Sequence, residues 1–176
     1  SARTDAPTLD DEEAEVVKEE MMALFKSLRS DEMGFAFRVG KEISRFIRLH
    51  RLLSEEEPSW EVTEALDAQI VQKILPKFNG SRDKLESSLC SLSVLCTTSR
   101  PWRTDDGEEE DDPQELEELV EEARNTSGRR SERYPIESDD SLRYDIEAAR
   151  YPLAYEKIVR MLRRLDREGF ASFAEA

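Results

Sequence analysis

The chain has 176 residues, with 26 basic against 41 acidic side chains, a formal net charge of −15 and 38% apolar residues. This length allows one ordinary domain or two small ones, and the apolar share is too high for a wholly disordered chain. No apolar run approaches the roughly 20 residues that span a bilayer, and the acidic start carries no apolar signal region.

The acidity is concentrated in two segments. Residues 1–20 carry a net charge of −6 and residues 105–124 a net charge of −11, which leaves +2 for the other 136 residues. The two segments are therefore expected to be solvated, around a body that is close to neutral.

The first helix is predicted to begin near residues 8–11, where Thr8 and Asp11 have the spacing of a capping box. Apolar residues then recur every three or four positions and form one stripe. Its members are Ala14, Val17, Met21, Leu24 and Leu28.

A second helix is expected over residues 35–53. Its apolar stripe ends at His50, and basic side chains occupy much of the remaining surface. The stripe is Phe35, Val39, Ile43, Phe46, Ile47 and His50, and the basic residues are Arg38, Lys41, Arg45, Arg48 and Arg51.

Two further helices are predicted before residue 97. Ser59 is the expected N-cap of the third, which carries an apolar stripe from Val62 to Ile74 and stops before Pro76. A turn over residues 79–81 then leads to the fourth helix, whose stripe is Leu85, Leu89, Leu92 and Cys96. Six residues apart on one helix, Cys90 and Cys96 should not pair; we expect both to be buried and reduced, as in a cytoplasmic protein.

The pattern weakens over residues 97–150. Residues 97–113 are predicted to be an exposed linker, 114–124 a short acidic helix resting on Leu116, Leu119 and Val120, and 125–140 a loop. A brief helical piece is expected over 141–149. Pro152 then starts the last helix, and Gly169 ends it with Phe170 folding back onto its last turn.

These elements predict an all-α fold of about five substantial helices, because no segment alternates convincingly with period two. We expect an N-terminal tail over 1–9, a helical bundle over 10–99, an acidic linker or insertion with short helices over 100–150, and a C-terminal helix over 151–176 that docks on the bundle.

The residues that catalysis requires are largely missing. The only histidine, His50, lies on an apolar stripe and is interpreted as a packed side chain. One histidine and two poorly spaced cysteines do not supply a zinc site, so no metal site is expected. The nearest approach to a phosphate-binding loop, Gly34 to Glu42, has one residue too many between its glycines and lacks the hydroxyl that holds magnesium.

Two basic features have both a plain and a functional interpretation. Arg38, at the start of its helix, is poorly placed for the helix dipole; it is either a surface residue or aimed at an anion such as a phosphate from another domain. Residues 150–167 carry a net charge of +4 and could contact nucleic acid or acidic parts of the same chain. For this helix we favour internal pairing or plain solvation, since the net charge opposes DNA binding.

Three stretches resemble the C-terminal part of the ATPase or GTPase subunit in McrB-like, modification-dependent restriction systems. They are Gly34–Ile47, Leu66–Ser81, and Tyr151–Leu165 closing with Gly169–Phe173. The middle stretch, with its pattern D-x-Q-I-x-Q-K-I-L-P-K-x-x-G-S, is the most distinctive.

The resemblance implies the helical lid of an AAA+ motor that acts in defence against foreign DNA. The family's P-loop, magnesium-binding acids and first sensor would lie upstream, so the chain alone would be non-catalytic and hold no cofactor, while the parent would use GTP or ATP with magnesium. Its expected partners are the AAA+ core of the same polypeptide, neighbouring subunits and a nuclease subunit, with DNA contacted only indirectly and no membrane. By this resemblance Arg38 matches a lid arginine that contacts nucleotide phosphate.

The alternative is a stand-alone acidic helical module that imitates nucleic acid or binds a basic partner. The two hypotheses differ in the residues they require. The lid needs Arg38 and residues 66–81 and treats 105–124 as dispensable, whereas the acidic module needs 105–124 and is indifferent to Arg38.

Overall fold

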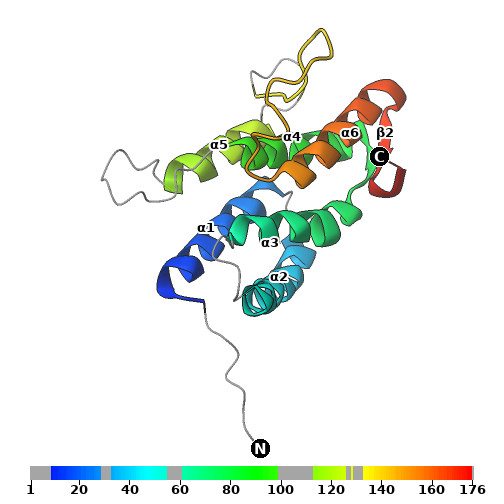
Figure 1. The fold of residues 1–176 in the computed structure, drawn as a ribbon. Helices are drawn as coiled ribbons and strands as arrows, with labels where there is room; N and C mark the ends of the chain where they lie inside the picture. Colours follow the sequence, from blue (N-terminus) through cyan, green and yellow to red (C-terminus); the bar gives the residue numbers. More distant parts are fainter. Residues whose placement is uncertain are drawn as a thin grey trace, which may run out of the picture.

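The computed structural model describes residues 9–28, 33–54, 61–98, 113–125, 128 and 133–175. Within these ranges the fold is mostly helical, as predicted, with a small two-stranded sheet in addition (Figure 1). The helices are α1 (Asp11–Ser27), α2 (Met33–Leu53), α3 (Val62–Gln69), α4 (Arg82–Thr97), α5 (Pro113–Asn125) and α6 (Pro152–Glu168). The shorter elements are the π-helical turn η1 (Ile70–Ile74), the 3-10 turns η2 (Leu75–Lys77) and η3 (Phe173–Glu175), and the strands β1 (Asn79–Ser81) and β2 (Phe170–Ser172).

α1 begins within the predicted range, but its N-cap lies two residues after the predicted one. Asp10, and not Thr8, is the N-cap: its side chain accepts a hydrogen bond from the Glu13 N–H at 2.7 Å, and the Asp10 N–H donates to Glu13 Oε2 at 3.1 Å. This reciprocal pair has a glutamate at the third helical position, as a capping box requires, whereas Asp11 is too short to serve Thr8. Thr8 itself lies outside the described residues.

The apolar stripes of α1 and α2 are mostly buried. In α1 this holds for Val17, Met21, Leu24 and Leu28, while Ala14 at the solvated first turn is exposed. In α2 it holds for Val39, Ile43 and Ile47, with Phe46 and His50 half-buried.

The third helix begins and ends differently from the prediction. Its N-cap is Glu61, which makes no side-chain capping bond, and Ser59 lies outside the described residues. The α-helix ends at Gln69, but the chain keeps turning as a π and then a 3-10 turn, so Pro76 lies inside a helical segment. Proline is tolerated there because the first residues of a helical turn have no partner for their N–H groups.

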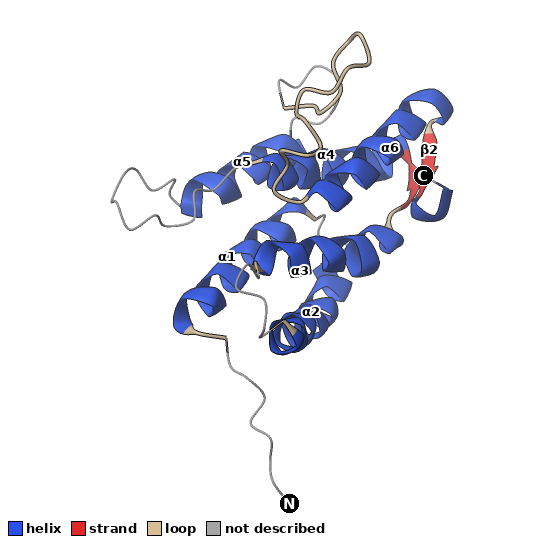
Figure 2. Ribbon diagram, viewed as in Figure 1, coloured by secondary structure: helices blue, strands red, loops and turns tan. Residues whose placement is uncertain are grey.

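The all-α prediction is confirmed, but it did not include the small two-stranded sheet. Residues 79–81 form β1 instead of a turn, and they pair antiparallel with β2, with Gly80 opposite Ala171 (Figure 2). Three-residue strands are too short to show a period of two. Phe170 does not fold back onto α6: it is 44% exposed in β2, while the next residue, Ala171, is buried.

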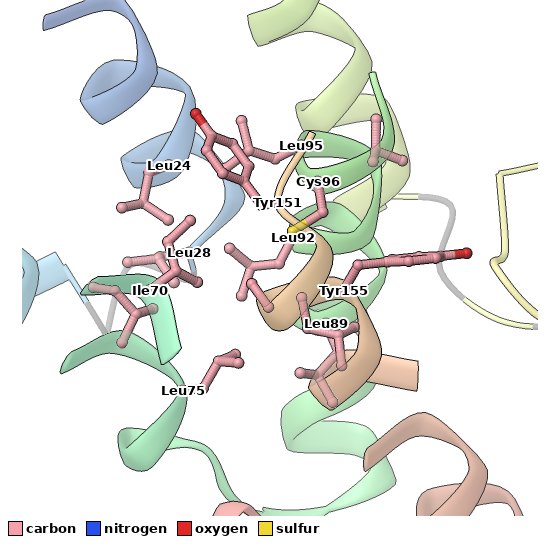
Figure 3. Packing of buried hydrophobic residues seen from close by; sticks show 14 of the residues in the cluster. Leu24, Leu28, Ile70, Leu75, Leu89, Leu92, Leu95, Cys96, Tyr151 and Tyr155 are labelled. Atoms are coloured by element: carbon pink, nitrogen blue, oxygen red, sulfur yellow. The ribbon is translucent and has the colours of Figure 1, made fainter. Parts of the chain in front are cut away.

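The core gathers around α4, which packs against α1, α5 and α6. Figure 3 shows its leucines and Cys96 clustered with Leu24 and Leu28 of α1, Ile70, Leu75 and the rings of Tyr151 and Tyr155. Buried serines on α4 are satisfied by backbone carbonyls: the Ser93 hydroxyl donates to Cys90 O, and the Ser91 hydroxyl donates to Val120 O on α5. The C-terminal helix α6 packs against α4 and α3.

The described part of residues 113–149 belongs to this core. Val120 and Ala123 of α5 are buried, as are Tyr134 and Ile136. The helical piece expected over 141–149 is wrong: the segment consists of turns, with a bridge between Ile136 and Leu142. Asp139 accepts bonds from both the N–H and the hydroxyl of Ser141, a local pattern that competes with helix formation.

Candidate functional site

Arg38 lies on the outer face of α2. Because the helix begins at Met33, Arg38 falls in its second turn and not in the first, and its side chain is exposed. Lys41, Arg45 and Arg48 follow at intervals of three and four residues, so the four cations line one face over about 15 Å. We call these four residues the basic stripe. None of them makes an ion pair or hydrogen bond with another described residue.

The surroundings of the basic stripe are tied to the rest of the fold. Glu42 beside it is engaged by Lys73 of η1, with 3.0 Å between Oε2 and Nζ. Arg51, outside the stripe, pairs with Glu13 at 3.0 Å and fixes the end of α2 to the start of α1. The outer face of α2 is therefore held in a fixed orientation and presents its cations to solvent.

The basic residues of α6, by contrast, are used within the chain. Arg150, just before the helix, pairs with Glu20 at 2.6 Å, and Lys157 lies over the Phe173 ring with 4.5 Å to the centroid. Three arginines of the helix also have partners: Arg160 pairs with Glu156, Arg164 with Glu168 and Glu175, and Arg163 donates to the Asp140 carbonyl. Of the two favoured interpretations of this helix, internal pairing and plain solvation, these residues show internal pairing.

A buried carboxylate joins α3 to the start of α6. Asp67, 3% exposed, accepts hydrogen bonds from the N–H groups of Leu153 at 2.9 Å and Ala154 at 2.8 Å. The N-cap residue Tyr151 supplies no side-chain bond, so Asp67 performs the capping from another helix. Burial raises the pKa of this carboxyl, and the two backbone bonds offset part of that rise.

A second buried junction connects α1 to the same point. The Tyr151 hydroxyl donates to Glu20 Oε2 at 2.6 Å, and Arg150 Nη2 lies 2.6 Å from Glu20 Oε1. Burial raises the pKa of the Tyr151 hydroxyl well above its ordinary value. The sequence analysis singled out neither Glu20 nor Asp67. The available signal was that each of these acids lies next to an apolar stripe residue of its own helix.

The other candidates form no site in the described part of the chain. His50 packs against Phe46, with ring centroids 5.6 Å apart. Cys90 and Cys96 are free and buried as expected, and burial raises the Cys90 pKa to about 12. Among the described residues, no group of three or more histidine, cysteine, aspartate or glutamate side chains could hold a metal ion. No helix in these ranges is long and apolar enough to cross a membrane.

Comparison with protein families assigns the chain to one of them. It belongs to the family described as Domain of unknown function (DUF8727), whose model matches residues 2–170. Neither the curated proteins nor the solved structures contain a significant match.

Proposed function

We propose that this chain is a non-catalytic helical lid and C-terminal region of a McrB-like AAA+ motor. In this proposal it closes a nucleotide site that another part of the protein forms, and Arg38 contacts the phosphates. The parent protein hydrolyses GTP or ATP with magnesium and drives a partner nuclease in the restriction of foreign DNA.

The observation that carries the proposal is the solvent exposure of Arg38 and its lack of a partner among the described residues. Its guanidinium is exposed and has no partner among the described residues, on a helix whose opposite face is buried. A guanidinium offers several N–H donors and a permanent charge, which suits contact with phosphate oxygens. An arginine held by neighbouring acids in its own chain would not be available for such a contact.

The packing of the resembling stretches supports the same proposal. Glu42 from the first stretch pairs with Lys73 from the second, at 3.0 Å. Asp67 from the second caps the helix that the third stretch forms, and β1 pairs with β2 across the same two stretches. Residues that are far apart in the sequence thus form one unit, as a lid would require.

Deleting residues 105–124 would not distinguish the acidic-module alternative from the lid. The lid hypothesis treats residues 105–124 as dispensable, but the end of α5 packs into the core. Val120 of α5 is buried, and Arg124 donates to the carbonyl oxygens of Lys26 and Leu28 at 3.2 and 3.0 Å. Deletion would remove part of the core under either hypothesis, whereas a charge change at the exposed Glu118 would not.

The first test is the coding sequence immediately upstream of Ser1. The proposal expects an in-frame G-x-x-x-x-G-K-[ST] motif followed by an acidic motif. A start codon directly before Ser1 would contradict it, as would turnover of GTP or ATP by the purified chain alone.

A further inference from the structure

A second surface, far from α2, has the opposite charge. The segment between α5 and α6 and the second turn of α6 form a shallow, open hollow. Three apolar or aromatic side chains and three carboxylates line it: Leu142, Tyr144, Ile146, Asp145, Glu147 and Glu156. We call this surface the acidic hollow. Tyr144 is 43% exposed, and Asp145 and Glu147 are also exposed.

The C-terminal half of the outer face of α2 has matching chemistry. Leucine side chains accompany the cations Arg45 and Arg48 there: Leu49 is 56% exposed, Leu52 38% and Leu53 85%. An arginine-rich surface with apolar anchors is typical of protein interfaces. A nucleic-acid backbone would leave the leucines without a role.

We propose that α2 of one copy docks in the acidic hollow of a second copy. Arg45 and Arg48 face Asp145 and Glu147 across this contact, while the α2 leucines cover Leu142, Tyr144 and Ile146. Glu156 already pairs with Arg160 of its own helix at 2.5 Å, so it contributes less to the attraction.

The positions of the two surfaces decide between intramolecular and intermolecular contact. Figure 1 shows α2 at the bottom of the molecule, while the segment before α6 runs from the top down to the start of α6, with α1 and α3 between them. One chain therefore cannot bring its own two surfaces together. Contact between copies uses two different surfaces, so it is heterologous and adds subunits head to tail. This inference does not depend on Arg38 or on nucleotide, so it can fail without affecting the proposed function.

Sedimentation equilibrium of the full chain tests the contact directly. At about 50 mM salt we expect an average mass that rises with protein concentration, and at about 500 mM salt a return to the monomer, because exposed ion pairs are screened. A monomer at every concentration in low salt would overturn the proposal.

Two charge reversals identify the surfaces. Arg45→Glu changes α2 and Glu147→Arg changes the hollow, and neither side chain has a partner among the described residues. We expect each variant alone to lose at least about tenfold in association constant. Their equimolar mixture should associate again, because it contains one unaltered pair of surfaces and the two reversed charges are opposite in sign in the other pair.

The matched controls are Lys77→Glu and Glu64→Arg, which make the same charge changes at exposed positions outside both surfaces. They should associate like the natural chain, and circular dichroism should show all four variants folded. Equal losses in the controls, or no dimer in the mixture of Arg45→Glu and Glu147→Arg, would overturn the proposed contact.

Discussion

Replacing Asp67 with alanine tests how the C-terminal helix is held. The change leaves α3 intact but removes both acceptors for the Leu153 and Ala154 N–H groups at the start of α6. We expect the free energy of unfolding to fall by about 3 kcal/mol.

The magnitude follows from the burial of the two N–H groups. Loss of an N-cap side chain costs about 0.5–2 kcal/mol, and a buried N–H left without an acceptor costs about 1–3 kcal/mol. The Ala154 N–H pays this second cost in full because Ala154 is buried, whereas Leu153 is 58% exposed and water can replace its acceptor. The unfavourable burial of the carboxylate, which raises the Asp67 pKa, offsets part of the loss.

Urea unfolding followed by far-ultraviolet circular dichroism measures the change. For a chain of this length the expected loss lowers Tm by about 6–12 °C. Asp67→Asn retains one acceptor and should fall between the natural chain and Asp67→Ala. The matched control is Glu64→Ala, an exposed acid on the same helix, expected to stay within about 0.5 kcal/mol. If Asp67→Ala destabilised the protein no more than this control, the capping argument would be refuted.

Three further predictions concern the Glu20 junction, the helix end at Gly169 and the buried groups Cys90 and Tyr155. Glu20→Ala should lower the free energy of unfolding, measured in urea, by about 3–5 kcal/mol, because it leaves Arg150 buried without its partner. The double change Glu20→Leu with Arg150→Met should recover most of that loss. A loss below about 1 kcal/mol for Glu20→Ala would contradict this. Gly169→Ala should lower the free energy of unfolding by about 1–2 kcal/mol, and Gly169→Asn by less, because Gly169 has a φ of +71°. An added Cβ would meet no atom within 4 Å, so backbone strain is the only cost. An alanine variant as stable as the natural chain would contradict this reasoning. Burial raises the pKa of Cys90 from 9.0 and of Tyr155 from 10.0 to about 12, so the unfolded chain loses these protons first. Stability should therefore fall as pH rises from about 9 towards 12, by up to about 1.4 kcal/mol per pH unit for each group, and Cys90→Ala should flatten the slope; urea midpoints that do not change over this range would contradict it.

The sequence predicted the helices well where burial repeats with the helical period. Val17 to Leu28 and Leu85 to Cys96 lie on stripes that are buried along their length, so spacing alone indicated which face packs. The sheet escaped prediction because each strand has only three residues and is paired across about 90 positions of sequence.

The buried junctions could not be predicted for a related reason. Asp67 and Glu20 are acids in a chain that has 41 of them, and only the tertiary contacts with Leu153, Ala154 and Tyr151 distinguish them from solvated ones. The exposed basic face of α2, in contrast, was visible in the sequence, because its spacing alone separates the cations from the buried stripe.

The most direct test of the lid proposal is nucleotide hydrolysis by the natural protein that contains this chain together with its nucleotide-binding core. Arg38→Ala should lower kcat on the order of 100-fold if the guanidinium stabilises charge on the phosphates. Arg38→Lys should recover part of the rate. Lys18→Ala, which removes an exposed cation of α1 outside the three resembling stretches, should stay within about twofold of the natural rate. Equal rates for Arg38→Ala and Lys18→Ala would contradict the proposal that Arg38 contacts nucleotide.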